Sequence, residues 1–385
     1  MGKKKLLNDD SLASILSSVS SIVIGLIFGY IMLVIFNPAR SGNGFWNLIS
    51  AGLSSPAKLA KVLYQAAPLI LTGLSVGFAF KTGLFNIGAS GQYTVGAFFA
   101  LYAGIVLKLP WWAALLCAML GGALWGTFPG LFKALFNVNE VITSIMFNWM
   151  GLFLVNLSMS NIPEILADYY GASVANRTAN LQAANPSAII PAAGLDKLFG
   201  SPYMNISFVI VTAVAIIVYI VIEKTTFGYE LKACGFNKKA GMYAGINANR
   251  NIVLSMVIAG AISGLAGGIY YLAGTASYTI EKVLLSMGFN GIPVALLANS
   301  HPIGTILTGI FISYIQVGGE ALQPEYAKEI IDIIIATIIY LSALSLIMKN
   351  MIAQKLLNRN QKKKIVDVRY GTEISGEEDD DENIG

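Results

Sequence analysis

The stretch Gly83-Leu-Phe-Asn-Ile-Gly-Ala-Ser-Gly-Gln92 lies between two segments that are each apolar enough to cross a bilayer. It combines glycines with the polar residues Asn86, Ser90 and Gln92, and such residues loosen a helix. Irregular backbone at membrane depth is tolerated only where it is buried in protein or lines a water-filled path. The stretch therefore predicts a membrane conduit.

The rest of the chain has the composition of an integral membrane protein. Of its 385 residues 55% are hydrophobic and only 12% are charged, and the mean hydropathy is +0.66. A crossing helix needs about 20 mainly apolar residues. We therefore predict an all-α polytopic membrane protein with a cytoplasmic N-terminus (1–12), one transmembrane domain (13–348) and a cytoplasmic tail (349–385). The clearest spans are 13–36, 62–80, 87–107, 111–132, 141–158, 206–222, 252–272, 303–318 and 329–347.

A tenth span is predicted at residues 283–299. It is apolar, but Gly288-Phe-Asn-Gly-Ile-Pro293 interrupts it, which is expected where two half-helices meet inside protein. Ten crossings also place most Lys and Arg residues of the short loops, and both termini, on the cytoplasmic side. Nine would turn the basic tail outward, so we prefer ten.

The tail divides by charge. Its basic part, around Lys355 to Lys364, suits the anionic headgroups of membrane lipids, and the acidic end from Glu377 to Glu382 is typical of a solvated, disordered segment.

Several kinds of chemistry have no motif in the chain. It has one histidine, His301, two cysteines, and no spacing typical of metal ligands. It also has no phosphate-binding loop of the Gly-x-x-x-x-Gly-Lys type, so ATP would have to be bound by another subunit. We expect no cofactor, no nucleic-acid partner and no enzymatic activity in this chain.

An ion gradient remains the other energy source, although ionisable residues within the spans are few. Asp332 lies one turn into the last span, and the other candidates lie near span ends: Glu140, Glu223, Glu281 and Glu320. This argues against proton coupling and leaves sodium binding by backbone carbonyls open.

The cytoplasmic loop 224–250 contains a short predicted helix. Asn237 can cap its N-terminus, residues 238–244 give about two turns, and Gly245 suits the left-handed stop. Such a helix presents Ala240, Met242, Tyr243 and Ala244 for docking of a cytoplasmic partner. A basic helix lying on lipid is the alternative.

Four blocks of sequence resemble the permease subunits of bacterial nucleoside ABC importers, within the simple-sugar and branched-chain amino-acid permease superfamily. The blocks are Phe85-Asn-Ile-Gly88 with Gly91-Gln92, Asn139-Glu-Val-Ile-Thr-Ser-Ile-Met146 with Asn148, Gly228-Tyr-Glu-Leu-Lys-Ala233 through Ala244-Gly-Ile246, and Gly288-Phe-Asn-Gly-Ile-Pro-Val-Ala-Leu-Leu297 with His301-Pro302. They occur in the family's order over residues 60 to 345.

The resemblance implies a ten-helix permease in a bacterial cell membrane. It would pair with a second, related permease and a cytoplasmic ATP-binding subunit, and a lipid-anchored extracellular protein would deliver the nucleoside. The loop 224–250 would be its coupling element, with Glu230, Asn237, Ala240, Met242, Tyr243 and Gly245 as the ATPase-coupling residues. The family usually has an acidic residue where this chain has Ser90, so that carboxylate's role cannot be transferred.

A short internal similarity predicts two inverted repeats of four helices. Phe85-Asn-Ile-Gly88 and Phe289-Asn-Gly-Ile292 would occupy matching broken elements of the two halves. Separately, Gly260, Gly264 and Gly268 form a small-xxx-small row that predicts close helix packing.

We predict a translocation path lined by amide and aromatic side chains that suit a nucleoside, because amides can bond ribose hydroxyls and base edges while aromatic rings stack on a base. The residues are Phe85, Asn86, Gln92, Asn148, Phe289 and Asn290. The alternative is that these asparagines only cap broken helices. Sugars or branched-chain amino acids are the alternative substrates, and a gradient-driven carrier is the alternative mechanism.

Overall fold

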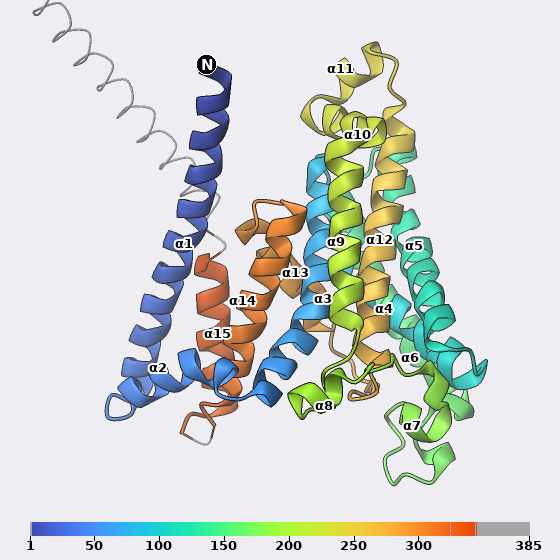
Figure 1. The fold of residues 1–385 in the computed structure, drawn as a ribbon. Coiled ribbons are helices and arrows are strands. Elements are labelled where there is room, and N and C mark those ends of the chain that lie inside the picture. Colours follow the sequence, from blue (N-terminus) through green and yellow to red (C-terminus); the bar gives the residue numbers. More distant parts are fainter. Residues whose placement is uncertain (1, 324, 343, 345–385) are drawn as a thin grey trace, which may run out of the picture.

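The computed structural model describes residues 2–323, 325–342 and 344, and the regular elements in that part are helices (Figure 1). Extended pairing there is limited to two isolated bridges, Leu166 with Thr178 and Arg177 with Thr279. The predicted all-α class is therefore confirmed. The predicted tail, 349–385, lies outside the described residues.

Seven helices are long and apolar enough to cross a membrane within the described part of the chain. They are α1 (Gly2–Phe36), α3 (Pro56–Lys81), α5 (Trp111–Phe136), α6 (Glu140–Ser160), α9 (Ser207–Lys224), α12 (Ala248–Leu272) and α14 (Pro302–Glu320). The chain is thus a multi-pass membrane protein.

The other three predicted spans correspond to shorter helices. They are α4 (Ala89–Leu101), which continues as a π-helical turn over Tyr102–Val106, α13 (Ser286–Leu297) and α15 (Lys328–Ser342). The last residues of the span predicted at 329–347 are largely outside the described part. The total of ten crossings and the inverted repeats remain predictions.

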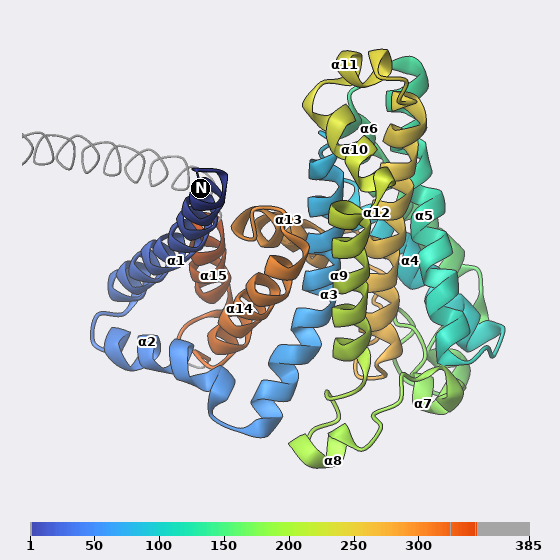
Figure 2. The same cartoon turned by 45° about the horizontal axis from the view of Figure 1, so that its top comes forward.

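The remaining helices are short and lie at the two ends of the bundle. Helices α10 (Thr226–Phe236) and α11 (Lys238–Tyr243) project at the end where α1 begins, whereas α2 (Ser41–Ser50), α7 (Leu181–Ala184) and α8 (Leu195–Phe199) lie at the opposite end (Figures 1 and 2).

The predicted interruption at Gly288–Pro293 is wrong, because α13 runs without a break through those residues. The two glycines serve close packing instead. A Cβ atom on Gly288 would lie 2.3 Å from the Cα of Ser90, and one on Gly291 would lie 2.6 Å from the carbonyl carbon of Thr72. Helix α13 therefore needs glycine to approach α4 and α3, and its irregular backbone lies before Ser286 and after Leu297.

The glycine row of α12 makes the close contacts that were predicted. A Cβ on Gly260 would lie 2.3 Å from the carbonyl oxygen of Gly122 on α5, and one on Gly264 would lie 2.3 Å from that of Ala118. On the other side of α12, a Cβ on Gly96 of α4 would lie 2.2 Å from the Cα of Gly264. Helix α12 is therefore held between α4 and α5 at backbone contact distance.

His301 begins α14 and has a structural role. Its Nδ1 accepts a hydrogen bond of 3.3 Å from the backbone N–H of Gly304. Burial, with Lys81 nearby, lowers the pKa of His301. The imidazole is therefore neutral near pH 7 and keeps the lone pair that caps the helix.

Candidate translocation site

The link between α3 and α4 is shorter than the sequence predicted. Helix α3 ends at Lys81, Gly83 has a positive φ of 70°, and α4 already begins at Ala89. Ser90 and Gln92 are thus helical, and only residues 82–88 are irregular. Both Asn86 and Gln92 are buried, with exposed fractions of 0% and 1%.

Asn86 and Gln92 bond to each other. The amide nitrogen of Asn86 donates to Oε1 of Gln92 at 2.9 Å, and the amide nitrogen of Gln92 donates to Oδ1 of Asn86 at 3.1 Å. Asn86 also donates to the hydroxyl of Ser75 on α3, which in turn donates to the carbonyl of Ala259 on α12. This amide pair therefore ties the link to α3, α4 and α12.

Asn148 of α6 holds the same link from the other side. Its Oδ1 accepts the backbone N–H of Gly91 at 2.8 Å, and its amide nitrogen donates to the carbonyl of Ile87 at 3.0 Å. The Gly91 N–H belongs to the first turn of α4, where backbone donors have no partner within the helix. Asn148 is thus a cap that α6 supplies to α4.

The remaining predicted path residues are less buried. Phe85 stacks on Phe80 with ring centroids 5.1 Å apart, and Phe289 and Asn290 are half-buried on α13. Ser90 donates its hydroxyl to the carbonyl of Leu285 at 2.9 Å. The start of α13 is therefore fixed to the start of α4.

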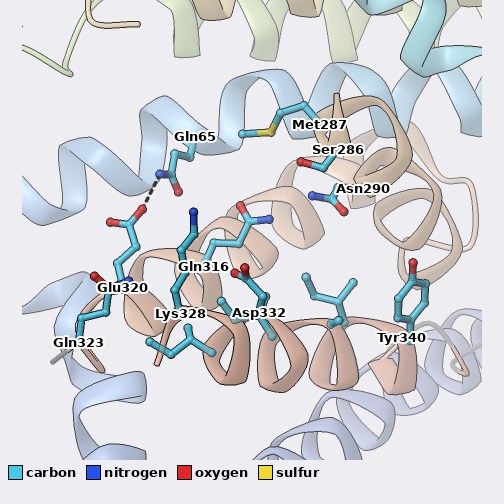
Figure 3. A pocket seen from close by; sticks show the side chains of 14 residues that line it. Gln65, Ser286, Met287, Asn290, Gln316, Glu320, Gln323, Lys328, Asp332 and Tyr340 are labelled. Carbon is cyan, nitrogen blue, oxygen red and sulfur yellow. Dashed lines mark hydrogen bonds between the residues drawn. The ribbon is translucent and has the colours of Figure 1, made fainter. Parts of the chain in front are cut away.

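A cavity of about 460 Å³ opens between α3, α13, α14 and α15 (Figure 3). Of the predicted path residues, Asn290 lines it. The other side chains around it, mixed polar and apolar, are Gln65, Ser286, Met287, Gln316, Glu320, Gln323, Lys328, Ile331, Asp332, Ile335, Ala336, Ile339 and Tyr340. Its size falls within the range of about 300–1,000 Å³ that is typical of small-molecule sites.

Sequence reasoning missed most of this cavity. Glu320 and Asp332 were considered only as ionisable residues of the spans, and Gln65 and Gln316 were not considered. A usable signal was present: Gln316 and Glu320, like Lys328 and Asp332, are four residues apart and so lie on one face of their helices. Nothing local indicated that these faces meet.

Glu320 is already engaged by protein groups at the mouth of the cavity. It forms an ion pair with Lys61, and its Oε1 accepts a hydrogen bond of 3.2 Å from the Gln65 amide (Figure 3). Both partners belong to α3. The contact therefore joins α3 to the end of α14.

The loop 224–250 holds two helices, α10 and α11, where one was predicted. Asn237 caps α11, with its Oδ1 accepting the Ala240 N–H at 3.1 Å, and Gly245 ends the segment with a φ of 83°. Ala240, Met242 and Tyr243 are exposed, Tyr243 by 93%. The predicted cap and stop are confirmed.

Glu230 lies on the inner side of this element. Its carboxylate accepts a hydrogen bond of 3.2 Å from the Asn251 amide, so α10 is anchored on α12. Gly235 also packs on the α3–α4 turn, since a Cβ there would lie 2.7 Å from the Lys81 carbonyl oxygen. The exposed surface of α10 and α11 is thus mounted directly on the transmembrane helices.

These features define a multi-pass helical membrane protein with a cavity of mixed polar and apolar lining between its helices and an exposed helical platform at one end. The chain belongs to the family described as the permease component of the branched-chain amino acid transport system, whose model matches residues 58–343.

Relatives named for nucleosides align over nearly their whole length. The chain is 34% identical over 343 residues to the guanosine ABC transporter permease protein NupP of Bacillus subtilis, covering 87% of this chain and 94% of that protein. It is 32% identical to the nucleoside ABC transporter permease protein NupB of Lactococcus lactis, covering 86% and 92%. A second guanosine permease protein of Bacillus subtilis, NupQ, is 28% identical and covers 66% and 79%. No solved structure gives a significant match.

Replacing Asn86 with leucine is expected to destabilise the protein by about 1–3 kcal/mol, because it leaves the buried Gln92 amide without its partner. The double variant Asn86→Leu/Gln92→Leu should lose less than the sum of the two single losses, since both partners go together. Thermal unfolding in detergent measures the stability loss of the two single variants and of the double variant. Asn249→Leu, at an exposed residue, is the control. Strict additivity would contradict the pairing.

Proposed function

We propose that this chain is the membrane-spanning subunit of an ABC importer that moves nucleosides into a bacterial cell with ATP hydrolysed by a separate subunit. The observation that carries the proposal is the match, over 86–87% of this chain, to permeases named for guanosine and nucleosides. The family description names branched-chain amino acids, so these remain, with simple sugars, the alternative substrate class.

Three partners follow from this proposal. Bacillus subtilis has two guanosine permease proteins that match this chain at 34% and 28% identity, which favours a mixed pair in which this chain takes the place of NupP. The ATP-binding subunit docks on the exposed surface of α10 and α11, which is cytoplasmic. A lipid-anchored binding protein delivers the substrate at the opposite end.

The predicted path residues divide into two groups in this proposal. Asn290 of α13 lines the cavity and Phe289 precedes it on the same helix, and in this proposal both face the moving substrate. Phe85, Asn86, Gln92 and Asn148 shape the α3–α4 link, and the hydrogen bonds of the three amides support a positioning role there. A bend held this firmly keeps its place while neighbouring helices rock during transport.

Reconstitution tests the function. Vesicles that hold this chain with its companion permease, ATP-binding subunit and binding protein should accumulate labelled uridine only when ATP is supplied to the nucleotide-binding side. Excess guanosine should compete, whereas ribose and leucine should not. Effective competition by leucine or ribose would show instead that the substrate is a branched-chain amino acid or a simple sugar.

A gradient-driven carrier acting alone is the mechanistic alternative. It predicts uridine uptake by vesicles that contain only this chain, without ATP, under an inward sodium or proton gradient. Such uptake would overturn the ABC assignment, and its absence alongside ATP-driven uptake by the full assembly would support it.

A further inference from the structure

The cavity between α3, α13, α14 and α15 gathers amide, hydroxyl and carboxylate groups from segments far apart in the sequence. Figure 3 shows Gln65 reaching in from α3, Asn290 from α13, Gln316 from α14 and Asp332 from α15. Because amides donate and accept hydrogen bonds, such a wall suits an uncharged ligand with many polar groups.

Asp332 is a carboxylate of this wall that has no partner among the described residues. Within the described residues, no cation lies within ion-pair distance of its carboxylate and no hydrogen bond occupies it, whereas Glu320 is taken by Lys61 and Gln65. The residues around Asp332 on α15 are almost all isoleucine. A carboxylate in so apolar a helix raises the free energy of placing that helix in a membrane, and no described contact of Asp332 offsets this cost.

A carboxylate has two oxygens that accept hydrogen bonds and no donor when ionised. Two neighbouring hydroxyls of a ribose present two donors at matching spacing, and dinucleotide-binding folds use an acidic side chain on the ribose hydroxyl in this way. The amides of Gln316 and Asn290 can both donate and accept, as the edge of a base requires. The wall thus supplies an acceptor for the hydroxyls of a sugar and amides for the edge of a base.

We infer that Asp332 accepts the 2′- and 3′-hydroxyls of a ribonucleoside in this cavity and makes it a substrate-selecting site within a single permease chain. This inference rests on the proposed function, since it names the part of a nucleoside that the cavity recognises. The permease would then select among substrates in addition to any selection by the binding protein.

The test compares uridine with 2′,3′-dideoxyuridine in ATP-driven uptake by the reconstituted full assembly. The affinity of the isolated binding protein for each compound is measured separately. The ratio of the two uptake rates is then divided by the ratio of the two affinities. Wild-type protein should still favour uridine by about tenfold, since hydrogen bonds to a charged acceptor contribute about 1.5–3 kcal/mol and 1.4 kcal/mol is a factor of about ten.

Asp332→Asn should lower uridine uptake (as Vmax/KM) by about tenfold and leave dideoxyuridine uptake within about twofold, because the neutral amide loses the charge-assisted bonds. Asp332→Glu should retain part of the preference. Glu329→Gln makes the same acid-to-amide change at an exposed residue of the same helix that does not line the cavity, so it is the matched control and should keep the wild-type ratio.

The outcomes separate two failures. Equal uptake of the two compounds by wild-type protein, or an equal loss for both in Asp332→Asn, would overturn the role of Asp332 while nucleoside import stands. Absence of ATP-driven uridine uptake by the wild-type assembly would instead overturn the proposed function. If Asp332→Asn does not fold, Asp332→Glu decides: a reduced preference for uridine would support the role of Asp332, and a ratio unchanged from wild type would overturn it.

Discussion

Replacing Gly264 with leucine should abolish recovery of folded protein. Gly264 is in backbone contact with α5 on one side and α4 on the other: a Cβ there would meet the Ala118 carbonyl oxygen at 2.3 Å, and the Cα of Gly264 would lie 2.2 Å from a Cβ on Gly96. No rotamer relieves a clash between a Cβ and backbone, so the helices must separate. We expect a loss of more than about 3 kcal/mol, the upper end of ordinary overpacking.

Fluorescence-detected size-exclusion chromatography of detergent extracts measures the result. Gly42→Leu is the matched control, because Gly42 is exposed on α2 and nothing lies within 4 Å of an added Cβ. It should give the wild-type peak. A monodisperse Gly264→Leu protein with wild-type thermal stability would refute the close contact of α12 with α4 and α5.

The second large effect concerns coupling. Replacing Ala240 with arginine should leave insertion and stability unchanged, because the side chain is exposed at the capped start of α11. Uptake per ATP hydrolysed should fall by at least about tenfold, since a bulky charge within the proposed docking surface removes well-packed contacts. Parallel measurement of ATPase rate and uridine uptake in reconstituted vesicles gives this ratio.

Asn249→Arg serves as the control for added charge on the same side of the molecule. Asn249 is also exposed but lies on the first turn of α12, beyond α11. The uridine uptake per ATP hydrolysed by the Asn249→Arg variant should match that of the wild-type protein. If Ala240→Arg transported normally at normal expression, α11 would not be the docking element, and the alternative of a helix resting on lipid would gain support.

Properties that depend on neighbouring residues could be predicted from the sequence. The cap at Asn237 and the stop at Gly245 were predicted because helix ends are decided within a few residues. Apolar segments of crossing length were found because the bilayer sets a minimum length. The glycine row of α12 indicated close packing because spacing of four places residues on one face.

The glycines of α13 show where local reasoning reaches its limit. Gly288 and Gly291 in sequence with Pro293 favour a broken helix, yet the helix is intact because those glycines face Ser90 and Thr72 at backbone distance. The same residue type signals a bend or a close approach, and only the neighbouring helix distinguishes them.

The sequence alone determined the membrane setting, the all-helical class, the two ends of α11 and the family, because hydropathy, helix caps and motif order depend on residues that are close together in the chain. Only the tertiary structure decided that Asn86 pairs with Gln92, that Asn148 caps α4, and that Asp332 meets Gln65 and Asn290 around one cavity. Those contacts depend on which helix faces pack together, and that is fixed by close packing between segments far apart in the chain.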